Sequence, residues 1–281
     1  MRTVLAVDVG RTGCRAAFWR GDASQPEAVA DGDGSLGLGA ANGPDVAEAA
    51  ILAVVQPLLK AHDVDCIDAA GVGTPGAMQG PASACRLAEQ LVRSLPARAV
   101  AVTSDAITSH AGALGGNPGV VLAAGTGAVT VAIGADARFR RVDGWGPWLG
   151  DEGSGAWLGR QALMAAARAE DGRGPATALS ESAARQFGSI GELAARLGFD
   201  PNPARSVAAF APAVADAARY GDPVAVQLVE AAATALARSM IAAAETLDTS
   251  GPVAAVIVGG LVNLGPVLLD PLRAALERSG A

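Results

Sequence analysis

The feature that most constrains this chain is a pair of glycine turns, each enclosed by two short apolar runs. Residues 8–13 form the first turn, DVGRTG, and residues 124–127 form the second, AGTG. An apolar run, a glycine turn and a second apolar run are typical of a β-hairpin, whose exposed backbone N–H groups can approach an anion. Two such hairpins that face each other could bind a polyphosphate from both sides.

The predicted elements begin in the same order twice along the chain. The first half predicts strands and helices in this order: strands 4–9, 14–19 and 27–30, helix 45–60, strand 68–72, helix 81–94 and strand 99–103. From residue 119 the pattern restarts, with strands 120–123, 128–133 and 138–142, helices 152–169, 176–187, 206–220 and 224–247, strand 253–258 and a helix from 265. This repetition predicts an α/β protein of two lobes, 1–108 and 109–281, with a cleft between them.

Composition excludes several partners. The chain of 281 residues carries a net charge of −7, and its longest basic cluster is residues 138–141, so neither nucleic acid nor an anionic membrane surface is expected to bind it. The first residues lack the length of a secretory signal, and Arg238 and Glu245 interrupt the longest alanine-rich stretch. We therefore expect a cytoplasmic protein.

The scarcity of certain residues narrows the chemistry. Lys60 is the only lysine and does not follow a glycine, so the lysine of a P-loop is absent. No Gly-x-Ser-x-Gly motif is present for acyl transfer. Carboxylates must therefore carry out any acid–base step.

Two aspartates at strand ends are candidates for that work. Asp8 opens the first glycine turn, where a carboxylate can hold Mg²⁺ through water, or can simply accept the N–H groups of a tight hairpin. Asp105 follows the strand 99–103 and is our candidate general base for a sugar hydroxyl that attacks a γ-phosphate. Asp105 could also act as the N-cap of the next helix, and both roles are compatible.

The densest segment, residues 143–154, combines two tryptophans with glycines and ends in Asp151 and Glu152. A sugar suits such a loop, because its C–H face packs on an aromatic ring and its hydroxyls donate to carboxylates. The two carboxylates could instead only complement the positive end of the following helix.

Five segments carry a family resemblance by their order and spacing: 8–14, 103–106, 124–127, 144–154 and 258–260. In these segments the chain resembles the BadF/BadG/BcrA/BcrD ATPase family, and within it the N-acetylglucosamine kinases. The resemblance implies the actin-like, sugar-kinase and Hsp70 fold, with two ribonuclease-H-like lobes around a Mg-ATP cleft. It implies a catalytic base at Asp105 and a Mg²⁺ ion at Asp8. It further implies ATP contacts at Gly10, Arg11, Thr12, Gly125, Thr126, Gly127, Gly259 and Gly260. The implied sugar contacts are Asn42, Asp105, Thr126, Gly144, Trp145, Gly146 and Asp151.

One departure concerns the first turn, where Val9 and Arg11 replace two glycines that are usual in the family. Arg11 either adds a phosphate contact or narrows the loop. The resemblance also leaves a homodimer and the nucleotide preference open.

We therefore predict an ATP- and Mg²⁺-dependent amino-sugar kinase that phosphorylates the 6-hydroxyl of N-acetylglucosamine, in amino-sugar salvage. Glucosamine and N-acetylmuramic acid are the alternative substrates. A more distant alternative is an ATPase that activates a dehydratase, but Cys66 and Cys85 are poorly placed to hold its iron–sulfur cluster. A non-catalytic sugar sensor is a third class.

Overall fold

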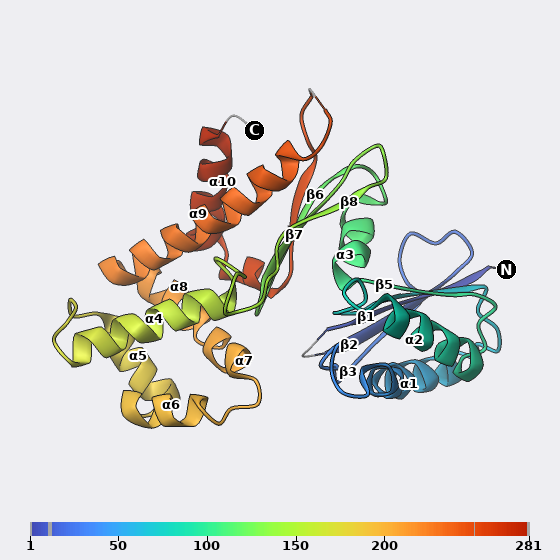
Figure 1. Ribbon diagram of the computed structural model, residues 1–281, viewed down its shortest axis with the longest axis horizontal. Helices are drawn as coiled ribbons and strands as arrows, with labels where there is room; N and C mark the ends of the chain where they lie inside the picture. The colour runs from blue at the N-terminus through green and yellow to red at the C-terminus, as the bar shows by residue number, and fades with distance from the viewer. Residues whose placement is uncertain (1, 11–12, 250, 280–281) are drawn as a thin grey trace. The chain divides into compact units, whose positions relative to one another are not determined.

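The computed structural model describes residues 2–10, 13–249 and 251–279. The chain forms two compact units, the first ending at Gly112 and the second beginning at Ala113 (Figure 1). This division falls inside one helix, slightly beyond the predicted boundary at residue 108. Each unit is described by itself below.

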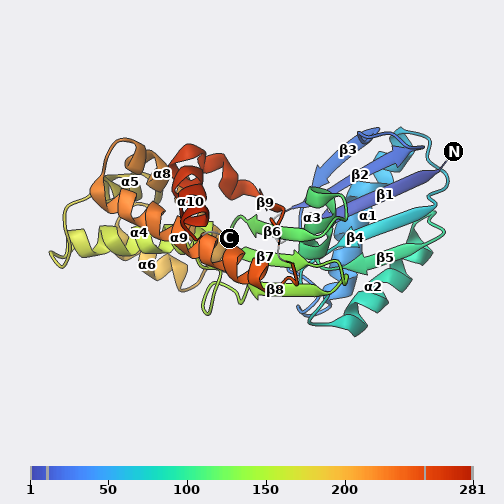
Figure 2. The same cartoon turned by 90° about the horizontal axis from the view of Figure 1, so that it is seen from above.

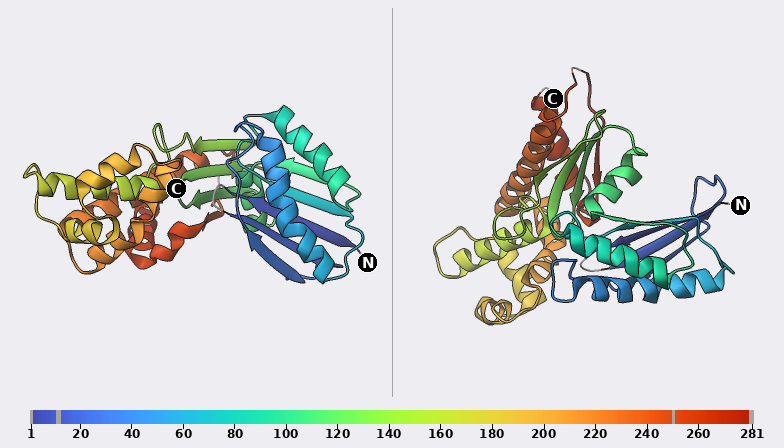
Figure 3. Two further views of the ribbon diagram at one scale, coloured as in Figure 1. Left: turned by 90° about the horizontal axis from the view of Figure 1, so that it is seen from below. Right: turned by 45° about the vertical axis from the view of Figure 1, so that its right-hand side comes forward.

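The first unit is built on a mixed sheet of order β3-β2-β1-β4-β5 (Figure 2). The hairpin β1–β2 and strand β3 are antiparallel, whereas β4 and β5 run parallel to β1. The strands are β1 (Thr3–Val9), β2 (Cys14–Arg20), β3 (Ala28–Gly32), β4 (Ala69–Gly73) and β5 (Val100–Thr103). The helices are α1 (Gly43–Ala61), α2 (Pro81–Ser94) and α3 (Asp105–Leu114), of which α1 and α2 lie side by side on one face of the sheet (Figure 3).

Buried and accessible side chains alternate along β1, and this alternation determines which face of the strand packs into the core. Leu5, Val7 and Val9 are buried, while the intervening Ala6 and Asp8 remain accessible. The buried side chains pack in one cluster with apolar residues of α1 and α2. Each large apolar side chain in such a core contributes about 1.5–3 kcal/mol. The pattern that buries Val7 and Val9 therefore also keeps Asp8 accessible.

The second unit has a smaller sheet of order β8-β7-β6-β9, in which only β9 is parallel to β6. Its strands are β6 (Gly119–Ala124), β7 (Ala128–Ile133), β8 (Phe139–Asp143) and β9 (Ala255–Val258). Its helices are α4 (Gly155–Glu170), α5 (Ala178–Phe187), α6 (Ile190–Leu197), α7 (Pro203–Ala208), α8 (Ala211–Arg219), α9 (Pro223–Glu245), the 3₁₀ turn η1 (Gly260–Leu264) and α10 (Pro266–Arg278). The predicted α/β class with two hairpin-led sheets is confirmed.

Two helical expectations differ from the structure. The predicted helix at 206–220 is two helices, α7 and α8, because Pro212 lacks a backbone N–H and is suited only to the first turn of a new helix. Helix α6 was not predicted, although Ser189 and Glu192 form a capping box at its start. A Ser-x-x-Glu motif was therefore available in the sequence as a signal.

Helix α9 is long and apolar enough, by length and composition, to cross a membrane. The core helix of a folded domain passes the same test. In this unit α9 packs against α10, α8, α4 and the sheet, and its buried positions include Val229, Leu236 and Met240. These contacts account for its apolar composition.

Gly159 in α4 provides a stability test. A Cβ at this position would overlap the Val207 carbonyl oxygen, so α4 and α7 pack with no room for a methyl group. We expect Gly159→Ala to lower the free energy of unfolding by about 1–3 kcal/mol, measured by denaturant titration. Gly191→Ala in α6 is the matched control, because nothing lies within 4 Å of its Cβ position and alanine favours helix. Equal stability of the two variants would contradict this account of the packing.

Candidate active site

In the first unit, the carboxyl ends of three parallel strands lie in register. Asp8 of β1 pairs with Gly73 of β4, and Gly73 pairs with Thr103 of β5. Asp105 begins α3 two residues after Thr103. Ligands of open α/β sheets bind at this edge, so the structure brings the predicted metal ligand and the predicted base to the same edge of one sheet.

The first turn of α3 holds the Asp105 carboxylate. Its Oδ1 accepts the Ser104 hydroxyl at 3.0 Å and the Ala106 N–H at 2.9 Å. The Ser104 carbonyl accepts the N–H groups of Ile107 and Thr108, so Ser104 opens the helix and Asp105 is its first residue. The prediction that Asp105 is the N-cap is therefore wrong by one position, because Ser104 is the N-cap. The two hydrogen bonds to Oδ1 hold the half-buried Asp105 side chain in place.

Two effects raise the pKa of Asp8. The larger is the reduced solvation of its carboxylate among protein atoms, although the side chain stays accessible, and the smaller is repulsion by Asp105. Arg15, its cross-strand partner, opposes them in part. A carboxylate in this environment gains from a nearby cation.

The raised pKa has a measurable consequence for stability. Since the folded pKa lies above the unfolded value of about 3.9, ionised Asp8 costs stability as the pH rises above that value. We expect Asp8→Asn to have a higher melting temperature than the unchanged protein at pH 7, with the gain disappearing below about pH 4. Asp22→Asn, in the exposed turn after β2, controls for the loss of a surface charge. A melting temperature for Asp8→Asn at or below that of the unchanged protein at pH 7 would refute the expectation.

The remaining predicted residues of the first unit lie in loops. The Gly10 N–H donates to the Gly13 carbonyl at 2.8 Å, as expected for a hairpin turn, whereas Arg11 and Thr12 lie outside the described residues. Asn42 precedes α1 in a left-handed conformation (φ 53°) and is exposed, and its side chain does not cap that helix. Its loop rests on the segment after β4, because the Leu38 N–H donates to the Pro75 carbonyl at 2.9 Å.

In the second unit, the predicted phosphate turn is anchored to the start of α4. The Gly125 N–H donates to the Gly127 carbonyl at 2.8 Å, which closes the β6–β7 hairpin. The carbonyls of Gly125 and Thr126 accept the N–H groups of Gly155 and Ala156 at 2.8 and 3.0 Å. The position of the turn is thus set by the first helical residues after the tryptophan segment.

Asp151 connects this turn to the predicted sugar loop. Its Oδ1 accepts the Gly146 N–H at 3.1 Å, and its Oδ2 would lie 2.6 Å from a Cβ at Gly127. A side chain at position 127 would therefore have to displace the Asp151 carboxylate. The carboxylate lies between Gly146 on one side and the phosphate turn on the other.

The predicted adenosine residues lie against the same turn. Gly259 follows β9 with φ 101°, and a Cβ there would overlap the Ala124 carbonyl oxygen. The Gly260 nitrogen lies 4.0 Å from the Cβ position of Gly125. In this unit the structure thus brings the predicted phosphate, sugar and adenosine residues together around residues 124–127.

Asp143, the last residue of β8, was not among the predicted site residues. Its carboxylate accepts the Asp151 N–H at 2.8 Å and the Glu152 N–H at 2.9 Å. The available signal was an aspartate between a strand and a glycine, a place where a short acceptor side chain often binds nearby backbone.

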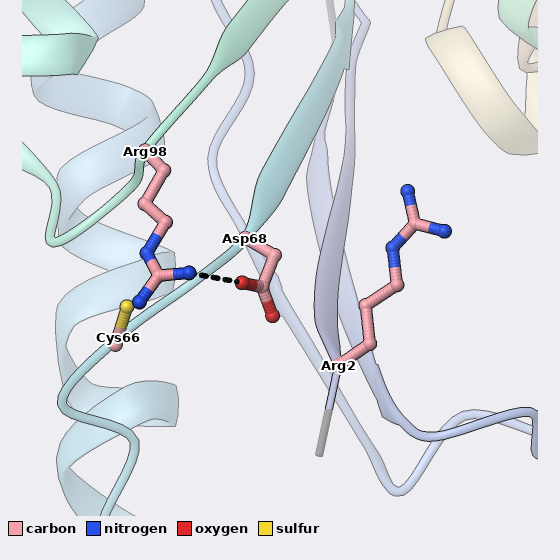
Figure 4. Close-up of a pocket in the computed structure, with 4 residues that line it drawn as sticks. All are labelled: Arg2, Cys66, Asp68 and Arg98. Atoms are coloured by element: carbon pink, nitrogen blue, oxygen red, sulfur yellow. Dashed lines mark hydrogen bonds and ion pairs between the residues drawn. The ribbon is translucent and has the colours of Figure 1, made fainter.

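A cavity of about 470 Å³ lies elsewhere in the first unit, near the amino ends of β1 and β4 (Figure 4). Its lining residues are Arg2, Cys66, Asp68 and Arg98. Both Asp68 oxygens are engaged, Oδ1 by Arg98 at 3.1 Å and Oδ2 by the Thr3 N–H at 2.8 Å. None of the predicted site residues lines this cavity.

The fold and these clusters define a protein of the actin-like sugar-kinase fold. A crystal structure of a candidate N-acetylglucosamine kinase from Chromobacterium violaceum matches with TM-score 0.79 and 28% identity, over 99% of this chain and 93% of that one. A glucokinase of the ROK family from Streptomyces griseus, in complex with glucose and AMPPNP, matches with TM-score 0.59 and 20% identity, over 98% of this chain and 89% of that one. The latter likeness concerns the fold alone.

The family model of the BadF/BadG/BcrA/BcrD ATPase family matches residues 5–277, and the chain belongs to this family. A curated relative, the N-acetylmuramic acid/N-acetylglucosamine kinase of Clostridium acetobutylicum, is 29% identical over 210 residues, which are 73% of this chain and 68% of the relative. The N-acetyl-D-glucosamine kinase of Dictyostelium discoideum is 37% identical over 81 residues, 28% of this chain and 25% of that protein. The predicted family and the predicted enzyme class, a sugar kinase, are confirmed.

Proposed function

We propose that this protein transfers the γ-phosphoryl group of ATP to the 6-hydroxyl of N-acetylglucosamine. The observation that carries the proposal is the contact of Asp151 with both Gly127 and Gly146. Through this contact the carboxylate predicted to bind sugar adjoins the turn predicted to bind phosphate, which supports transfer from ATP to a sugar. The relatives named as N-acetylglucosamine kinases support the choice of sugar.

The second unit would supply most of the binding groups. Asp151 would accept sugar hydroxyls, while Trp145, which is 65% exposed, offers a ring face to the sugar C–H groups. Thr126 and the flanking glycines would receive phosphate oxygens and an adjacent sugar hydroxyl. Gly259 and Gly260 would lie beside the adenosine.

The first unit would supply the base. Asp105 would accept the proton of the 6-hydroxyl as that oxygen bonds to the γ-phosphorus and the bond to the β-phosphate oxygen breaks, which releases ADP. Its carboxylate keeps a fixed orientation because Ser104 and Ala106 bind Oδ1. Gly10, Arg11 and Thr12 would add phosphate contacts, and Asn42 a sugar contact.

Magnesium is part of this proposal. Mg²⁺ usually binds one or two carboxylates together with water and substrate phosphates. Asp8 fits that role because the pKa of its carboxyl is raised by its surroundings and by Asp105. The ion would neutralise charge that develops on the phosphates.

N-Acetylmuramic acid is the second candidate substrate, since the Clostridium acetobutylicum relative is named for both sugars. Glucosamine stays a third. An assay of ADP release with N-acetylglucosamine, N-acetylmuramic acid, glucosamine and glucose, and without sugar, tests the proposal. We expect the highest kcat/KM with N-acetylglucosamine and Mg²⁺ dependence throughout. Sugar-independent ADP release of equal rate would refute a kinase.

The same proposal includes the cellular location of the protein and its partners. The cysteines Cys14, Cys66 and Cys85 form no disulfide, which suits a reducing cytoplasm. The net charge of −7 supports the expectation that nucleic acid and anionic membranes are not partners. A homodimer stays a prediction that the molecular mass in solution would test.

Asp105 provides the mechanistic test. Asp105→Asn keeps the size of the side chain and an oxygen for the Ala106 N–H but removes the proton acceptor. We expect kcat to fall by about 10²-fold or more while the sugar KM changes little, measured by coupled ADP release. Asp45→Asn, at the start of α1, is a control for the loss of an aspartate in a first helical turn. Unchanged kcat in Asp105→Asn would exclude it as the base.

A further inference from the structure

The loop at residues 143–153, which we call the tryptophan loop, is exposed at its apolar tip. Trp145, Trp148 and Leu149 are 65%, 77% and 84% exposed. Burial of these side chains therefore contributes little to holding the loop in place. A fixed conformation has to come from polar contacts at its base.

Two aspartates make those contacts in opposite directions. Asp143, where the loop begins, accepts the N–H groups of Asp151 and Glu152 at 2.8 and 2.9 Å through its two oxygens. Asp151, near the end, accepts the Gly146 N–H at 3.1 Å. Each aspartate thus binds backbone from the other part of the loop, and together they close it into a ring.

The backbone of this ring is held away from common conformations. Asp143 and Asp151 have φ values of 60° and 53°, a region that favours glycine and tolerates aspartate and asparagine. A Cβ at Gly150 would overlap the Asp143 Oδ1 and lie 3.0 Å from the Trp145 Cβ. Position 150 therefore has to be glycine for the Asp143 carboxylate to reach its two donors.

Two arginines hold the flanks of the loop. The Arg141 guanidinium carbon lies 4.5 Å from the centre of the Trp145 ring, and Arg160 of α4 donates to the Pro147 carbonyl at 2.9 Å. Neither of these contacts involves Asp151, whose N–H donates to Asp143 and whose carboxylate accepts the Gly146 N–H.

We infer that Asp143 is a positioning residue for sugar binding: by holding the Asp151 backbone it fixes the Asp151 carboxylate before the sugar arrives. This inference rests on the proposed function. Without Asp143, the sugar would have to order the loop as it binds, and part of its binding free energy would be lost. The affinity for nucleotide would not change, because nucleotide binding does not require the loop to become ordered.

The first test is Asp143→Asn, which tolerates the left-handed backbone but places an amide group opposite one of the two N–H donors. We expect the sugar KM to rise about 10- to 100-fold, since charge-assisted hydrogen bonds are lost, with the ATP KM within about 2-fold and kcat within about 3-fold. Calorimetric titration of the sugar without ATP should show the same loss. Loss confined to the sugar separates positioning from general destabilisation.

The matched control is Asp63→Asn, since Asp63 is an exposed aspartate of similar conformation (φ 51°) after α1. It should leave both KM values unchanged. Gly150→Ala is a second variant, because the added methyl group would displace the Asp143 carboxylate without removing it. It should reproduce the weaker sugar binding, and it decides the matter if Asp143→Asn does not fold.

The outcomes are distinguishable. If the unchanged protein binds no amino sugar, the proposed function fails. If it binds one and Asp143→Asn binds it equally well, the inference about Asp143 fails and the proposed function stands. Equal weakening of sugar and ATP would also overturn it, because a positioning role predicts an effect on the sugar alone.

Discussion

The close approach of three chain segments around residues 124–127 is the constraint on which the candidate site depends. The carboxylate of Asp151 fills the space that a side chain at position 127 would need, and the turn after β9 fills the space beside Ala124. Three chain segments therefore meet where glycines at positions 127 and 259 leave room for them. The hydrogen bonds from Gly155 and Ala156 then fix the turn to α4.

In the first unit, strand register brings predicted site residues together. Parallel pairing of β1, β4 and β5 aligns the ends of the strands, so Asp8 and the start of α3 share an edge. The repulsion between Asp8 and Asp105 that follows is unfavourable for the isolated protein. Sites built for charged ligands commonly retain such a cost, because the ligand relieves it.

Period-two apolar runs and glycine turns were sufficient to predict both hairpins, since burial of Leu5, Val7 and Val9 determines which side chains stay accessible. Strand ends were predictable for the same reason, and they located Asp8 and Asp105. The role of Asp143 was not predictable, because it depends on a left-handed φ and on amide groups eight and nine residues away. The break between α7 and α8 was available from Pro212 but was outweighed by the surrounding alanines.

The proposed phosphate contacts include main-chain groups in glycine-rich segments, and this affects how the site would respond to genetic change. Truncation of a side chain leaves these main-chain amide groups in place. The harmful changes are those that add atoms, so random mutagenesis would inactivate this region through gains in bulk. Alanine substitution at Gly127 or Gly259 would then report the steric effect of the added methyl group. The contribution of the N–H groups at these positions to binding would have to be measured by chemical modification of the backbone.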